Sequence, residues 1–154
     1  MKLTETLSQN ILNVFEGTNW TDVAITDVLS DITYSQAATV TAASKNSIAA
    51  LAHHLLYWNK IIMQRMLGEN PFVPDSNGFD VGKLATEEDW HKLVADLHQS
   101  FIDLSNAIRN FPENRLKDLT KSGKSTIESN IYGIIEHAYY HLGQMMILKN
   151  LLMH

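Results

Sequence analysis

The sequence contains no cysteine, and only three prolines and seven glycines occur among its 154 residues. Without cysteine, the chain has no disulfide bond, no zinc–thiolate site and no thiol nucleophile of its own. Any thiol chemistry would therefore use a thiol on a substrate or cosubstrate. Because glycine and proline fall mainly at breaks between periodic segments, we expect helices with few interruptions.

Long apolar runs and an excess of positive charge are also missing. No run of about 18 apolar residues is present, so we expect no membrane-spanning helix. The segment from Met1 to Leu7 does not resemble a secretion signal, which makes the cytoplasm the expected location. The net charge of -5 gives no general basic field for nucleic acid. Length and composition fit one globular domain over residues 1–154.

Apolar residues recur every three or four positions in four long segments, which is the spacing of amphipathic helices. We expect these helices over residues 3–15, 45–67, 86–111 and 125–152. A short helix is expected within residues 21–31, and residues 33–43 fit neither helix nor strand clearly. Residues 69–83 are expected to form a long surface loop, because they contain two prolines and an Asn-Gly pair. This pattern predicts an all-α four-helix bundle with an extra short helix between the first two long helices.

Three histidines are placed to meet inside such a bundle. His137 and His141 are one helical turn apart and lie near the apolar stripe of the last helix. At 100° per residue, His54 flanks the apolar stripe of the second long helix, whereas His53 faces the opposite, exposed side. Inward imidazoles need polar partners. Two explanations stay open: hydrogen-bonded core histidines, or three neutral ligands of a divalent metal with an open coordination position.

Several neighbouring residues have two possible roles. Asn130 fits a helix-to-helix hydrogen bond or a pocket wall, and Gln144 fits support of a ligand histidine or simple packing. Gly143 is predicted to allow close helix packing, because glycine inside a helix costs about 1 kcal/mol relative to alanine. Trp58 is expected in the core stripe. Arg65 lies on the His54 side of its helix, but too far along it to reach the metal.

The strings Ser47-Ile, His54-Leu-Leu-Tyr-Trp58 and His137-Ala-Tyr-Tyr-His141-Leu-Gly-Gln144 resemble the pattern of the DinB/YfiT-like metalloenzyme superfamily. The resemblance covers essentially the whole chain. It implies an up-and-down bundle of four helices, which is often a homodimer. It also implies a divalent metal, most often nickel or zinc, with His54, His137 and His141 as its ligands.

The resemblance leaves the reaction open between several chemistries. Some relatives transfer low-molecular-weight thiols such as bacillithiol or mycothiol, and others resemble maleylpyruvate isomerase or metal-dependent hydrolases. The expected function is therefore a metal-dependent enzyme for a small-molecule substrate, either a thiol S-transferase or a hydrolase. The alternative is a non-catalytic, stress-related metal-binding or dimerisation module. No general base stands out in the sequence.

Overall fold

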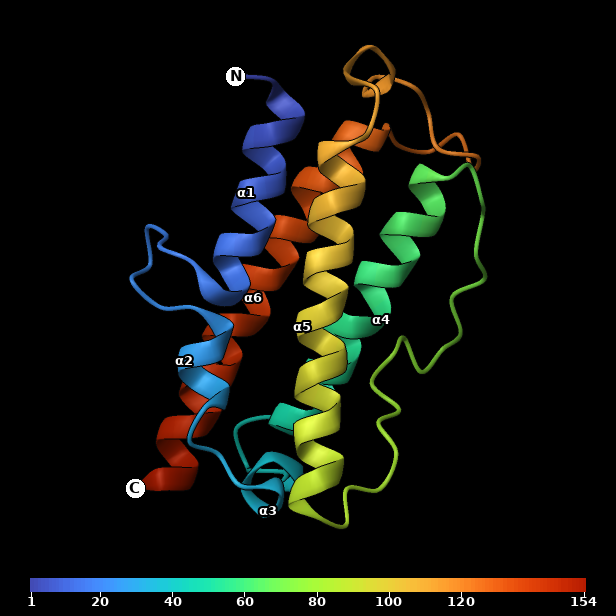
Figure 1. Ribbon diagram of the computed structural model, residues 1–154. Helices are drawn as coiled ribbons and strands as arrows, with labels where there is room; N and C mark the ends of the chain where they lie inside the picture. The colour runs from blue at the N-terminus through green and yellow to red at the C-terminus, as the bar shows by residue number, and fades with distance from the viewer.

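The computed structural model describes residues 1–154, and all of its regular elements are helices (Figure 1). The four long helices are α1 (Leu3–Glu16), α4 (Ile48–Met66), α5 (Glu87–Arg109) and α6 (Ile127–Met153). The short ones are α2 (Ile25–Leu29), α3 (Tyr34–Ala38) and the 3-10 turn η1 (Glu113–Arg115). The predicted all-α class and the four long helices are confirmed.

The long helices form a bundle in which α1 and α4 each pack against both α5 and α6. In Figure 1, α1 and α6 run downwards, whereas α4 and α5 both run upwards. The second and third long helices of the chain, α4 and α5, are thus parallel, whereas a strict up-and-down bundle would make them antiparallel. The segment 67–86 must consequently return along the length of the bundle before α5 can begin. Its path places part of this segment beside the middle of α4.

Two short helices, rather than the single one predicted, connect α1 to α4. The helix predicted within residues 21–31 is confined to α2, whose buried Ile25, Val28 and Leu29 face the core. In the segment that the periodicity leaves undecided, Thr33 caps α3 by accepting a hydrogen bond from the Gln36 amide. The Gln36 side chain reciprocally accepts from the Thr33 amide, which completes a capping box.

Side-chain caps fix where the long helices begin. Ser47 Oγ accepts from the Ala50 amide at the start of α4, so this helix begins three residues later than its periodicity predicts. Thr86 and Asp89 form the predicted capping box at α5. Thr126 alone caps α6. These caps set the register in which α4 and α6 face each other.

One hydrophobic cluster of 31 buried residues joins the four long helices. The most deeply buried side chains come from each helix in turn and include Ile11, Leu51, Leu55, Leu97, Phe101 and Ile131. Burial of aliphatic and aromatic side chains contributes about 1.5–3 kcal/mol each. This core holds α4 and α6 at a fixed separation, and the polar residues between them therefore lie on a rigid frame.

Candidate metal centre

Three histidine side chains converge between α4 and α6. The Nε2 atom of His137 lies 2.9 Å from His54 Nε2 and 2.9 Å from His141 Nε2. All three ligand atoms lie within 4.8 Å of one another. His54 and His141 are only 2% and 5% exposed, while His137 is half-buried. The structure thus brings together the three side chains that helix geometry selects from the sequence.

Two carbonyl oxygens orient the outer histidines of this group. His54 Nδ1 lies 2.5 Å from the backbone oxygen of Asn77, and His141 Nδ1 lies 2.6 Å from Gln144 Oε1. Both oxygens can only accept, so each Nδ1 carries the proton and each Nε2 presents a lone pair to the centre. Gln144 therefore supports a ring of the histidine group instead of simply packing against its neighbours.

The arrangement of nitrogens fits a metal ion. His137 Nε2 contacts two unprotonated nitrogens, yet it can donate at most one proton. With the proton on His137 Nε2, only one of the two contacts can be a full hydrogen bond; with the proton on His137 Nδ1, both contacts set lone pair against lone pair at 2.9 Å. A cation between the three nitrogens would satisfy all of these lone pairs. Tetrahedral bonds of about 2.0–2.1 Å to zinc would place ligand nitrogens about 3.3 Å apart. The two contacts of His137 would lengthen by only about 0.4 Å, from 2.9 Å, to reach that separation.

Burial keeps the three histidines neutral. It lowers the pKa of His54 to about 4, although the hydrogen bond to Asn77 acts in the opposite direction. It lowers the pKa of His137 to about 3, with a further contribution from the neighbouring His141 and His54. The pKa of His141 is also lowered by burial. At neutral pH all three rings are in the form that binds metals.

The segment between α4 and α5 completes one side of the site, which the sequence does not reveal. Besides bonding His54, Asn77 accepts a hydrogen bond from Trp58 Nε1 on its side-chain oxygen, at 3.0 Å. His53 is half-buried and its Nδ1 lies 2.7 Å from the Gly78 oxygen, so the prediction that it faces solvent is wrong. Phe79 stacks on the His54 ring with 3.8 Å between centroids. The only sequence signal for this contact is the Asn-Gly pair, which by itself indicates a turn.

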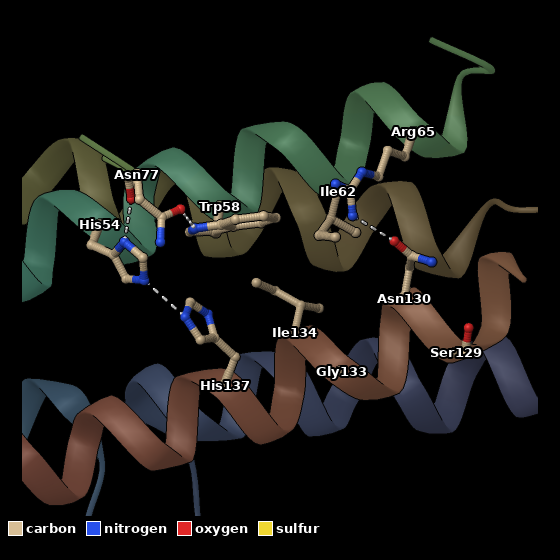
Figure 2. A pocket seen from close by; sticks show the side chains of 10 residues that line it. All are labelled: His54, Trp58, Ile62, Arg65, Asn77, Ser129, Asn130, Gly133, Ile134 and His137. Carbon is tan, nitrogen blue, oxygen red and sulfur yellow. Dashed lines mark hydrogen bonds between the residues drawn. The ribbon is translucent and has the colours of Figure 1, made fainter. Parts of the chain in front are cut away.

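A cavity of about 350 Å³ lies beside His54 and His137, between α4 and α6 (Figure 2). Trp58 is half-buried and lines this cavity, whereas its sequence position suggests the core. At the far end, Arg65 Nη1 donates to Asn130 Oδ1 at 3.0 Å, which is the helix-to-helix hydrogen bond expected of Asn130. The placement of Arg65 away from the histidines agrees with its predicted position.

Gly143 does not serve close helix packing within the chain. The residue is exposed, and a Cβ atom built on it would meet nothing within 4 Å. The prediction from helix propensity is therefore wrong for this position.

None of the helices combines the length and the apolar character that crossing a membrane requires. Comparison with curated proteins and with solved structures gives no match. A family model described as the DinB superfamily, however, matches residues 19–145. The matched region contains α4, the 67–86 segment and all three histidines of the site. Together with the helical bundle, this match over most of the sequence shows that the chain belongs to the DinB superfamily.

Proposed function

We propose that this protein is a metal-dependent enzyme in which His54, His137 and His141 hold a divalent metal, nickel or zinc. The observation that supports this most strongly is the convergence of three Nε2 atoms at the edge of a cavity. Three neutral ligands leave one coordination position open, as in catalytic zinc sites. We further propose that the substrate is a small molecule and that the reaction transfers a low-molecular-weight thiol, with hydrolysis as the competing reaction.

Two features support a catalytic metal over a purely structural one. No further histidine and no carboxylate joins the three-histidine group, whereas structural zinc sites are closed by four protein ligands. The adjoining cavity of about 350 Å³ is in the size range of small-molecule sites. A stress-related module with a merely structural metal would need neither an open position nor a cavity.

The side chains around the site would have two roles, which are to orient the metal ligands and to bind the substrate. Asn77 and Gln144 hold two ligand rings in their orientation. Trp58 and the aliphatic Ile62 and Ile134 would orient the substrate and exclude water from it. A bound divalent metal would supply Lewis acidity, which favours the thiolate form of a thiol and polarises carbonyl groups. Because the chain has no cysteine, the thiol must come from a cosubstrate.

The test is turnover of an electrophilic aryl chloride by the nickel- or zinc-loaded protein, with and without N-acetylcysteine as the small thiol. We expect conjugation that depends on thiol and metal and is lost in His137→Ala. His91→Ala removes an exposed histidine of α5 and serves as the matched control. Thiol-independent turnover of an aryl ester would instead favour the hydrolase. Absence of both activities in the metal-loaded protein would contradict the enzyme proposal.

We also propose that the chain forms a homodimer through α6. Tyr140, Ile147 and Leu151 lie on one side of this helix and are 64%, 60% and 55% exposed. Such a row of exposed apolar side chains is typical of an interaction surface. Light scattering should give twice the chain mass of 17.4 kDa, and Ile147→Glu should reduce it to the monomer. A monomeric wild-type protein at micromolar concentration would contradict this arrangement.

A further inference from the structure

The far end of the cavity carries a positive charge that no acidic residue neutralises. Arg65 is half-buried, and none of the salt bridges in the protein includes it. Its contacts are with neutral groups, namely the Asn130 oxygen at 3.0 Å and the Trp58 ring, whose centroid is 5.4 Å from the guanidinium carbon. One of the five guanidinium N–H donors is used in this way, and four remain.

The rest of the cavity lining contains no side chain that could neutralise this charge. None of the ten lining residues is an aspartate or a glutamate, although the protein as a whole has a net charge of -5. His54 and His137 line the opposite end of the cavity and belong to the three-histidine group. Arg65 is the one lysine or arginine among these ten residues. A half-buried guanidinium in such surroundings is suited to an anionic partner that enters from outside.

Asn130 holds Arg65 in place. Its side-chain nitrogen donates to Ser125 Oγ at 2.7 Å and to the backbone oxygen of Thr126 at 2.8 Å. These two acceptors fix the amide so that its oxygen faces the guanidinium, and the Trp58 ring lies along another side of the same group (Figure 2). Asn130 is thus a positioning residue. Because Asn130 also lies in the first turn of the 27-residue α6, the helix dipole adds positive potential here.

We propose that Arg65 binds the carboxylate of an acidic substrate whose apolar or aromatic middle lies against Trp58. Asn130 and His137 are seven residues apart on α6, which corresponds to about 10 Å along the helix. The substrate would therefore be a small carboxylic acid with its reacting atom roughly 10 Å from the carboxylate. This inference rests on the proposed function only in directing the reacting end towards the histidines. Recognition of the carboxylate by Arg65 requires no metal.

The test compares 3-phenylpropionate with 3-phenylpropionamide, two ligands of equal shape that differ in charge. Their affinities for the purified full chain are measured by isothermal titration calorimetry. We expect the carboxylate to bind at least about 10-fold more tightly than the amide, since a charge-assisted pair with arginine supplies that discrimination. Arg65→Gln should abolish the preference. Lys60→Gln removes an exposed positive charge from the same helix and should leave the preference unchanged.

A second variant tests the same idea while keeping the arginine. Asn130→Asp places a carboxylate where Oδ1 now accepts from Arg65, so this internal partner should neutralise the guanidinium and abolish the preference. The variants are compared by circular dichroism to establish that they are folded. A carboxylate preference that persists in both Arg65→Gln and Asn130→Asp would overturn the proposal.

The His137→Ala/His141→Ala double variant separates this proposal from the metal site. If the preference follows Arg65 and survives in the double variant, the carboxylate site stands even if the protein binds no metal. If the preference survives in Arg65→Gln but is lost in the double variant, the carboxylate binds at the histidines. That second result would overturn the role of Arg65 while supporting the proposed metal site.

Discussion

Substitution of Gly78 by alanine should weaken metal binding without touching any of the three histidines. Gly78 has a φ of +77° and follows Asn77, whose φ is +51°. A Cβ atom at Gly78 would lie 2.6 Å from Cγ of Tyr57 and 2.7 Å from two further atoms of that side chain. Tyr57 is on α4, one turn from His53, so the segment would have to move away from the helix that carries His54.

Two effects of Gly78→Ala lower the free energy of unfolding. Alanine at a left-handed φ costs about 1–2 kcal/mol. The clash with Tyr57 adds about 1–3 kcal/mol, the usual range for overpacking. The displaced segment also carries the Asn77 oxygen that holds His54 Nδ1 at 2.5 Å. Loss of such a supporting hydrogen bond lowers metal affinity by about 10- to 100-fold.

Gly68→Ala is the matched control for this experiment. Gly68 also has a positive φ, at +84°, but a Cβ atom there would meet nothing within 4 Å. Gly68→Ala should lower the free energy of unfolding by the backbone term alone, about 1–2 kcal/mol, and should leave the metal affinity unchanged. Unfolding is followed by circular dichroism in urea, and nickel affinity is measured by calorimetry. Equal nickel affinities of Gly78→Ala and Gly68→Ala would refute the claim that the 67–86 segment positions His54.

Three further outcomes are expected. Gln144→Leu removes the acceptor for His141 Nδ1 and should lower nickel affinity by about 10- to 100-fold in calorimetry, while a wild-type affinity would contradict the role of Gln144. Because burial lowers the pKa of His54 to about 4 and that of His137 to about 3, the unfolded chain binds more protons below pH 6.5. The metal-free protein should thus lose stability to urea as pH falls from 6.5 towards 4, and a loss that is the same in the His137→Ala/His141→Ala variant would exclude this origin. Leu55→Ala, at a fully buried position, should cost about 2–5 kcal/mol in urea unfolding, and a cost below about 1 kcal/mol would show that the core packs differently.

Helical periodicity predicts the bundle because the long helices are amphipathic over many turns. Their capping residues are also local, so the start of α5 at Thr86 can be read directly from the sequence. The parallel direction of α4 and α5 cannot be read in this way, since no local pattern encodes whether a connection of about twenty residues returns along the bundle. Short helices such as α3 are equally difficult, because five residues carry too little periodicity.

The positions of the site residues can be predicted from sequence where they depend on the geometry of one helix. They cannot be predicted where they depend on contacts with the 67–86 segment. The four-residue spacing of His137 and His141, and the angle that separates His54 from His53, follow from helix geometry. The same geometry predicts an exposed His53. That prediction fails because Gly78, from a distant segment of the chain, lies over this face of α4, and helix geometry contains no information about that contact. Arg65 and Asn130 meet only because α4 and α6 are neighbours, so their pairing is a property of the tertiary structure.

Metal content tests the central claim most directly. The tag-free protein and its His137→Ala/His141→Ala variant are dialysed against nickel or zinc, freed of excess metal and measured by elemental analysis. The three-histidine site predicts about one divalent metal per chain in the wild type and none in the variant. No metal in either protein, or equal metal in both, would contradict a metal site at His54, His137 and His141.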